Sequence, residues 1–186
     1  MDLHAGQIQG FFDIPVDHLF SVGVFVDYFS KMNIKDLVAV SPDVGSIKMA
    51  RAYAKRVSAG LAIIDKRRVS PEKAEAIHIM GEVEDKNVII VDDMIATGSS
   101  LVEAVEALKK AKAKTIYAAI SHGILSGPAI QRLDDCKGLE KLLISDSVPL
   151  TAEKQHAKIQ VLSVANLLAE AIKRIHNEES VSCLFD

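Results

Sequence analysis

Short apolar segments alternate with segments of helical periodicity along most of this 186-residue chain, and this alternation constrains the fold more than any other feature. We expect strands at 36–41, 61–65, 76–80, 87–93, 115–121 and 140–146. Several of them are apolar at consecutive positions, which is typical of a parallel sheet with both faces covered by helices. The pattern predicts an α/β fold with a doubly wound, mostly parallel sheet.

Apolar stripes at helical spacing predict the helices between these strands. One helix follows Ser46, a second begins near Ser99, and a short one follows Pro128, because proline suits the first turn of a helix. Residues 163–177 predict an amphipathic helix with Ser163 as its N-cap. The apolar residues near both ends of the chain either fold back on the core or pack on a neighbouring domain or subunit.

Composition excludes several classes of protein. The net charge of −3 argues against nucleic-acid binding driven by bulk charge. No apolar run approaches the roughly 20 residues that span a bilayer. The first residues do not resemble a signal peptide, and the two cysteines have no metal-ligand spacing. We therefore expect a cytoplasmic protein without a nucleic-acid or membrane partner.

The segment 87–100, "NVIIVDDMIATGSS", places two acids beside a turn suited to an anion. The turn consists of Thr97, Gly98, Ser99 and Ser100 at the start of a predicted helix, where free amides and hydroxyls bind phosphate. A simple helix cap is the commoner role of such a turn. Asp92 and Asp93 favour the binding site, because carboxylates at the end of a buried strand are costly unless they bind a polar group or a metal.

Four polar segments follow predicted strands, at 41–46, 65–73, 92–100 and 121–127. In an open α/β sheet, ligands bind outside the carboxyl ends of the strands, so these segments predict one shared site. The second contains Lys66, Arg67 and Arg68, which we interpret as a mobile clamp on phosphates rather than a solvated loop. The histidines alone indicate no function.

Residues 2–17, "DLHAGQIQGFFDIPVD", resemble the signature of the ribose-phosphate diphosphokinases, the synthetases of phosphoribosyl pyrophosphate. Further similar segments occur in the family's order: "SPDVGSIKMAR", "AIIDKRR", "VIIVDDMIATGSS", "HGILSGPA" and "SVSCLF". A long signature followed by ordered matches is far more specific than one phosphate loop. The resemblance implies a phosphoribosyltransferase-type fold and the transfer of diphosphate from Mg-ATP to the C1 hydroxyl of ribose 5-phosphate, which releases AMP.

The resemblance also implies roles for individual residues. Lys66 is the catalytic lysine, and Arg68 reaches the sugar phosphate and the transferred group. Asp92 and Asp93 bind the ribose hydroxyls and help to fix a cation. The loop that holds the 5-phosphate consists of Ala96, Thr97, Gly98, Ser99 and Ser100.

The remaining expectations concern the metal, regulation and assembly. His4 and Asp43 stand where the family places Mg²⁺ ligands, and Ser180 and Ser182 match a regulatory region that binds phosphate and nucleotide. Family members form dimers that assemble into hexamers, so we expect a homo-oligomer with ribose 5-phosphate and ATP as partners. Ser46 departs from the family pattern by replacing a common glycine.

The phosphate loop departs from the family as well. Ala96 stands where an aspartate is common, and Ser99 and Ser100 replace glycine or threonine. Loss of the carboxylate at position 96 would alter the sugar contact or the cation balance, whereas the serines keep hydrogen-bond donors in place.

The resemblance predicts three parts of the chain. Residues 1–17 correspond to the end of an N-terminal domain that carries the metal and ATP signature, and residues 18–160 form a phosphoribosyltransferase-like domain. The helix and tail at 161–186 would pack on the N-terminal domain. Family members have more sequence before the first of these parts, and it supplies much of the ATP pocket.

Three functions remain open. The first is a diphosphokinase, and the second is a regulatory or truncated homologue that binds sugar phosphate without turning over ATP alone. The third, a phosphoribosyltransferase acting on a base, is disfavoured because "DLHAGQIQGFF" and "IIDKRR" have no role there.

Overall fold

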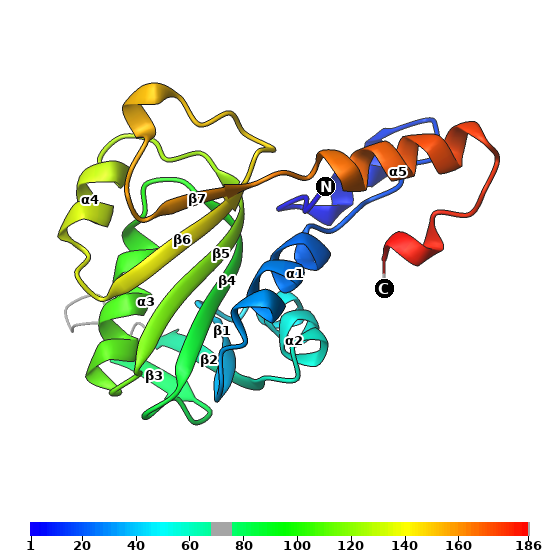
Figure 1. Ribbon diagram of the computed structural model, residues 1–186. Coiled ribbons are helices and arrows are strands. Elements are labelled where there is room, and N and C mark those ends of the chain that lie inside the picture. Colours follow the sequence, from blue (N-terminus) through cyan, green and yellow to red (C-terminus); the bar gives the residue numbers. More distant parts are fainter. Residues whose placement is uncertain (68–75, 186) are drawn as a thin grey trace.

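In the computed structural model, the described residues, 1–67 and 76–185, contain one seven-stranded sheet in the order β3-β2-β1-β4-β5-β6-β7 (Figure 1). All neighbouring strands pair in parallel except β2 and β3, which form an antiparallel hairpin at one edge. The strands are β1 (Leu37–Ser41), β2 (Gly60–Arg67), β3 (Ala76–Met80), β4 (Asn87–Ile95), β5 (Thr115–Gly123), β6 (Leu139–Ser145) and β7 (Ile159–Leu162). The predicted doubly wound, mostly parallel sheet is confirmed.

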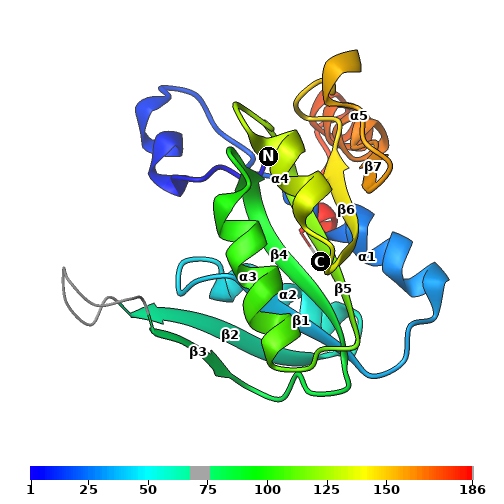
Figure 2. The same ribbon diagram turned by 90° about the vertical axis from the view of Figure 1, so that its left-hand side faces the viewer.

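Helices cover both faces of this sheet. α3 and α4 lie on one face, α1 and α2 lie on the other, and α5 projects beyond the sheet (Figures 1 and 2). The α-helices are α1 (Val22–Met32), α2 (Ile47–Arg56), α3 (Ser99–Lys110), α4 (Ala129–Asp135) and α5 (Ala165–His176). Short 3₁₀ helices occur at η1 (Gly6–Phe11), η2 (Ala152–Lys154) and η3 (Ser182–Leu184).

The central strands alternate their apolar side chains between two cores. In β4, Val88 and Ile90 face the core beneath α3 and α4, whereas Ile89 and Val91 face the core beneath α1 and α2. All four are buried. This two-sided burial explains why the strand is apolar at consecutive positions, and it supplies most of the driving force that fixes the sheet.

The order of the strands reverses beside β1. From β1 the chain moves outward to β2 and β3, and it then returns to β4 on the opposite side of β1. The chain therefore leaves the carboxyl ends of β1 and β4 in opposite directions. This is a topological switch point, where open α/β sheets bind their ligands. Asp43 follows the end of β1, and the acids predicted to bind ligand lie near the end of β4.

Helix α1 and strand β7 were not predicted, and the cap predicted for α5 is wrong. Helix α1 buries Val22, Phe25 and Phe29 at helical spacing, although its valines and aromatic residues favour strands. The edge strand β7 adds residues 159–162 beside β6. Helix α5 begins after the predicted cap: the cap position is Val164, and the Ser163 hydroxyl accepts the Ala165 amide at 3.2 Å.

Apolar side chains remain exposed at both ends of the described chain. On α5 only Ala171 is buried, while Ile172 is 68% exposed, and Phe11 in η1 is 87% exposed. Both segments lie on the same side of the molecule, beyond the carboxyl ends of the strands (Figure 1). Within the described part of the chain, no helix combines the length and the apolar character needed to cross a bilayer.

Candidate functional site

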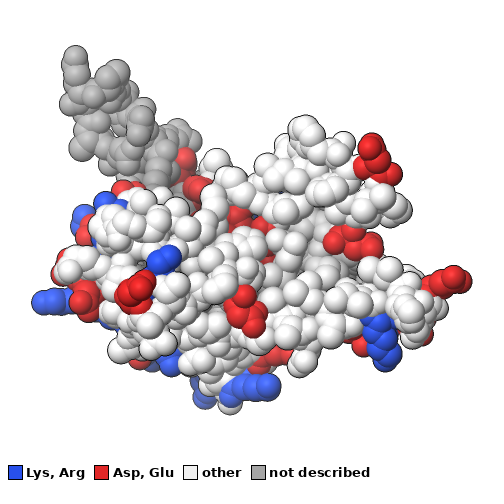
Figure 3. Space-filling view, turned by 90° about the horizontal axis from the view of Figure 1, so that it is seen from above, with Lys and Arg blue, Asp and Glu red and all other residues white. Residues whose placement is uncertain are grey.

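A cavity of about 360 Å³ opens at the switch point, between the ends of β1 and β4 and the start of α3. Seen from above, acidic side chains gather in the hollow of this end of the molecule (Figure 3). The structure brings together the predicted residues that line the cavity, namely His4, Asp43, Asp92, Asp93, Ala96, Thr97, Gly98, Ser99 and Ser100. Residues far apart in the sequence therefore share one site.

The loop between β4 and α3 presents unpaired backbone donors. Gly98 is the N-cap of α3 and adopts a left-handed conformation with φ of 77°. Within the described residues, the amides of residues 96–100 donate no hydrogen bond to another part of the protein. Free amides at the start of a helix attract an anion, and the hydroxyls of Thr97 and Ser99, 3.3 Å apart, add further donors. This loop has the chemistry of a phosphate site.

Asp92 is held by two hydrogen bonds from the protein. Its Oδ1 accepts a hydrogen bond from the Ser46 hydroxyl at 2.7 Å and another from the Asp93 amide at 3.0 Å. Burial raises the pKa of Asp92, and the two hydrogen bonds counteract part of that rise. A partly buried carboxylate held in this way is suited to accept hydroxyl groups from a ligand.

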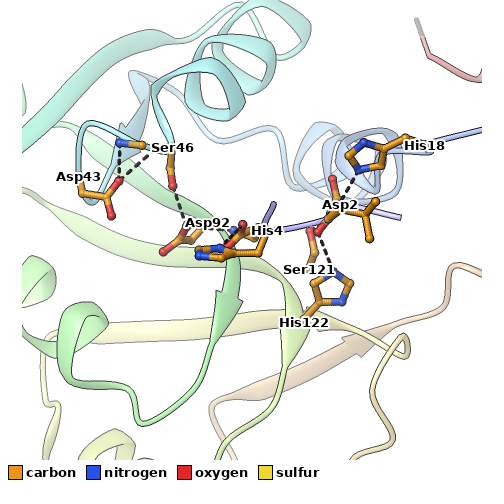
Figure 4. Close-up of polar contacts among 11 residues, drawn as sticks. Asp2, His4, His18, Asp43, Ser46, Asp92, Ser121 and His122 are labelled. Atoms are coloured by element: carbon orange, nitrogen blue, oxygen red, sulfur yellow. Dashed lines mark hydrogen bonds and ion pairs between the residues drawn. The ribbon is translucent and has the colours of Figure 1, made fainter. Parts of the chain in front are cut away.

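Ser46 connects the two strand ends (Figure 4). Its amide donates to Asp43 Oδ1 at 3.1 Å, as does the Gly45 amide at 2.8 Å, while its hydroxyl reaches Asp92. The sequence marked Ser46 only as a departure from a common glycine. The structure gives it a function that glycine lacks, because a hydroxyl is required to link the turn after β1 to the carboxylate on β4.

His4 reaches the site from the N-terminal segment. Its Nδ1 lies 2.8 Å from Asp93 Oδ2, and its side chain is 69% exposed. The hydrogen bond to Asp93 and the charge of that carboxylate raise the pKa of His4. The imidazole therefore lies at the mouth of the cavity, where a ligand in the site would meet it.

Asp2 anchors the segment that carries His4 (Figure 4). The buried Asp2 carboxylate accepts hydrogen bonds from the Ser21 amide at 2.9 Å and the Ser121 hydroxyl at 2.8 Å. The Asp2 carbonyl contacts His122 Nε2 at 3.0 Å, and the Leu3 amide donates to His18 Nε2 at 2.8 Å. Sequence reasoning missed this network, because its members are separated by up to 120 positions.

The donor set fits a magnesium ion that is completed by substrate. Among the described residues, no three His, Cys, Asp or Glu side chains are grouped closely enough to form a ready metal site. Magnesium, however, is usually held by one or two carboxylates together with water and substrate phosphates. Asp43, Asp92 and Asp93 supply carboxylate oxygens around one cavity, and His4 supplies a nitrogen at its edge.

The remaining predicted residues are Lys66, Arg68, Ser180 and Ser182. Lys66 is on β2, where its partner in the ladder is Ile77, and Arg68 lies outside the described residues. Ser180 and Ser182 contact one another at 2.8 Å near the C-terminal end and do not line this cavity. The segment 121–127 was predicted to share the site, but it also does not line the cavity and instead lies behind the loop.

Residues 66–186 match the family described as "Phosphoribosyl synthetase-associated domain". The whole chain is 50% identical to the ribose-phosphate pyrophosphokinase of Oceanobacillus iheyensis and covers 58% of that protein. It is 48% identical to the enzyme of the same name from Bacillus caldolyticus and covers 59% of it. The chain thus spans less than two thirds of the length of these curated relatives.

Solved structures agree with the fold. The phosphoribosylpyrophosphate synthetase of Mycobacterium smegmatis superimposes with a TM-score of 0.85 at 37% identity, over 95% of this chain and 57% of that chain. The orotate phosphoribosyltransferase of Aeropyrum pernix gives a TM-score of 0.52 at 16% identity, over 82% of this chain and 74% of its own. The sheet and its helices are therefore of phosphoribosyltransferase type.

Proposed function

This chain belongs to the phosphoribosyl synthetase-associated domain family, and from that premise we propose that it carries the ribose 5-phosphate site of a ribose-phosphate pyrophosphokinase. The reaction transfers diphosphate from Mg-ATP to the C1 hydroxyl of ribose 5-phosphate and yields phosphoribosyl pyrophosphate and AMP. One observation carries the proposal above the others: the cavity combines the unpaired amides of residues 96–100 with the carboxylates of Asp92 and Asp93.

This combination matches a phosphorylated sugar better than phosphate alone. Two carboxylates beside an anion site would repel a bare phosphate, because like charges at short range are unfavourable in a partly buried cavity. Ribose 5-phosphate resolves the conflict by placing its phosphate on the loop and its hydroxyls against Asp92 and Asp93. Ala96 supplies only its backbone amide to the ligand, so the sugar contact depends on the two acids.

Lys66 and Arg68 are proposed to act on the transferred diphosphate. Phosphoryl transfer needs little covalent help from a protein and depends on positioning and on neutralising charge. Cationic side chains that meet the phosphates as charge redistributes stabilise the transition state more than the bound substrate. The position of Lys66 on the β2–β3 hairpin, next to the switch-point strand β1, supports this assignment.

We propose Mg²⁺ as the cofactor, with Asp43 and His4 as its protein ligands and ATP as the second substrate. The ion supplies charge neutralisation between the phosphates and the acidic cavity. Ser180 and Ser182 are proposed to bind a regulatory phosphate or nucleotide. Cytoplasmic location and assembly as a homo-oligomer, dimer-based and hexameric as in the family, belong to the same proposal.

A second candidate function is binding without turnover. It is favoured by one observation, that the cavity combines phosphate donors with the carboxylates of Asp92 and Asp93, which are enough to bind ribose 5-phosphate in a regulatory role. The two candidates share the same cavity and differ in whether AMP is released.

An AMP-release assay separates these candidates. The chain is incubated with ribose 5-phosphate and Mg-ATP, alone and after fusion to the part of the Oceanobacillus iheyensis enzyme that it does not match. We expect negligible release by the chain alone and sustained release by the fusion. Release by the chain alone would show that this chain holds a complete ATP pocket. Ribose 5-phosphate binding with no release by the fusion would favour the regulatory function.

Lys66→Ala in the active fusion tests the catalytic assignment. We expect a loss of kcat of roughly 10² or more with little change in the KM for ribose 5-phosphate, because the lysine would act mainly in the transition state. Lys55→Ala, on α2, removes the same charge away from the cavity and serves as the control. A change in KM alone would assign Lys66 to substrate binding.

A further inference from the structure

Three consecutive carbonyl groups of the phosphate loop are held from one side by a single segment of the chain. Ile95 O accepts the amides of Ile124 and Leu125, each at 3.1 Å. The next carbonyl, Ala96 O, accepts the Ser126 amide at 2.9 Å. The third, Thr97 O, accepts a guanidinium N–H of Arg132 at 2.8 Å. We call residues 124–132 the backing segment.

These contacts determine where the loop amides point. The described chain contains no cis peptide bond, and in a trans peptide the C=O of one residue and the N–H of the next point in opposite directions. Carbonyls 95, 96 and 97 point toward the backing segment, so the amides of Ala96, Thr97 and Gly98 point away from it. They lie on the cavity side, where they have no partner within the described protein.

The backing segment is itself firmly held. Leu125 is buried and has a positive φ of 48°, which is a strained conformation for a residue with a side chain. In this conformation the successive amides of Ile124 and Leu125 both donate to the carbonyl of Ile95. Lys154 Nζ donates to Ile124 O at 2.7 Å from the far side. At Gly98 an added Cβ would lie 3.8 Å from Ala129, so the start of α4 packs directly behind the loop.

We infer that the backing segment pre-organises the anion loop and that Arg132 is a positioning residue for the Gly98 amide. This inference rests on the proposed function, because the loop is taken to bind the 5-phosphate of the sugar. An anion site is most effective when its donors already point at the ligand, since no reorganisation is then needed on binding. The segment "HGILSGPA", which lines no part of the cavity, thereby acquires a role in it.

Arg132 is the residue of the backing segment whose hydrogen bond to the loop a substitution can remove. Ile124, Leu125 and Ser126 act through backbone amides, which a side-chain substitution leaves in place, whereas Arg132 acts through its side chain. A competing explanation is that Arg132 attracts the phosphate only by its charge. The two explanations differ in the ligand-free protein, because positioning requires the Thr97–Gly98 peptide to change when the guanidinium is removed.

The first measurement therefore uses no ligand. Amide NMR spectra are compared for the full chain, Arg132→Met and Lys137→Met, the last of which removes the same charge from an exposed residue after α4 without a contact to the loop. We expect the Gly98 amide resonance to move and its hydrogen exchange to change severalfold in Arg132→Met alone. Unchanged Gly98 shifts and exchange in Arg132→Met would overturn the positioning role.

The second measurement is binding of inorganic phosphate and of ribose 5-phosphate. Loss of the aligned Gly98 amide as a donor to the charged phosphate predicts a rise in Kd of about 10-fold to 100-fold for both ligands in Arg132→Met, against less than about 3-fold in Lys137→Met. Arg132→Lys keeps the charge and one donor for Thr97 O, so we expect it to restore the Gly98 shift and part of the affinity. Equal Kd values in the full chain and Arg132→Met would overturn the inference.

The failure of the proposed function has a different signature. If the unmodified chain bound neither phosphate nor ribose 5-phosphate, the sugar-phosphate site would be wrong, whereas the ligand-free Gly98 spectra would still decide whether Arg132 positions the loop. The free energy of unfolding of each variant is measured alongside. If Arg132→Met were too unstable to study, Arg132→Leu would be measured by the same criterion: a moved Gly98 resonance supports positioning, and an unchanged one contradicts it.

Discussion

His4 Nδ1 lies 2.8 Å from Asp93 Oδ2, although 89 positions separate the two residues in the sequence. This contact places the N-terminal segment over the end of β4 and completes the mouth of the cavity. The ion pair itself is exposed, so it contributes little to holding the segment in place. The buried carboxylate two residues earlier, Asp2, provides the anchor.

Asp2→Ala is expected to lower the free energy of unfolding by roughly 2–4 kcal/mol. It removes two hydrogen bonds to a buried carboxylate and leaves the Ser21 amide and the Ser121 hydroxyl without their acceptor. Urea unfolding of both proteins measures the change. Asp17→Ala, at an exposed position of the same segment, is the matched control and should change stability by less than about 0.5 kcal/mol. Equal effects of the two substitutions would contradict the anchor.

His18 is expected to make the protein less stable in mild acid. Burial lowers the pKa of His18, whose Nε2 accepts the Leu3 amide and must be unprotonated to do so. As the pH falls below about 6.5, the unfolded state takes up a proton that the folded state resists, so stability is lost. The urea midpoint of the unmodified chain should fall more between pH 7.5 and pH 5.5 than that of His18→Gln. Identical pH dependence in the two proteins would show that this contact does not titrate.

Asp92→Asn should make the protein more stable while it weakens sugar binding. Because burial raises the pKa of Asp92, the unfolded state releases this proton at lower pH than the folded state does. The ionised form therefore costs stability once the pH has risen through the folded pKa. Thermal unfolding at pH 7 should give a higher Tm for Asp92→Asn, with each kcal/mol worth roughly 2–4 °C. The difference should vanish as the pH approaches 4, and a gain that is independent of pH would refute its electrostatic origin.

Removing the Ser46 hydroxyl should raise the pKa of Asp92 further. The hydrogen bond from Ser46 favours the ionised carboxylate and so opposes the effect of burial. Carboxyl NMR titration of the unmodified chain, Ser46→Ala and Ser46→Thr measures this directly. The threonine variant keeps a hydroxyl and is expected to titrate near the unmodified chain, whereas the alanine variant titrates at higher pH. Similar titration of all three would show that the Ser46 contact has no effect on the charge of Asp92.

The fold was predictable where local pattern and tertiary structure agree. The central strands are apolar at consecutive positions because both faces are covered, and residues 87–93 and 115–121 were found for that reason. Helix α1 was not predicted, because tertiary packing of Phe25 and Phe29 overrides the strand preference of its residues. Strand β7 is short and only partly buried, so pairing with β6 defines it and its own sequence does not.

The residue types that face the cavity at the strand ends could be predicted from the sequence. The contacts that hold those residues in place could not. The chemistry of Asp92, Asp93 and the loop follows from sequence neighbours and from the rule that ligands bind at the switch point. The links made by Ser46 and Arg132 depend on how separate elements pack together. Thr97 and Arg132 lie 35 positions apart, and no local pattern marks that pair.

The central claim is that the loop binds the phosphate and the acids bind the sugar of one ligand. An amide NMR titration of the full chain with ribose 5-phosphate, and separately with ribose, tests it most directly. We predict that ribose 5-phosphate shifts the amides of residues 96–100 together with those of Asp92 and Asp93. Ribose at the same concentration should leave the loop amides unchanged. Saturable binding of ribose 5-phosphate that moved neither the loop nor the two acids would contradict the account.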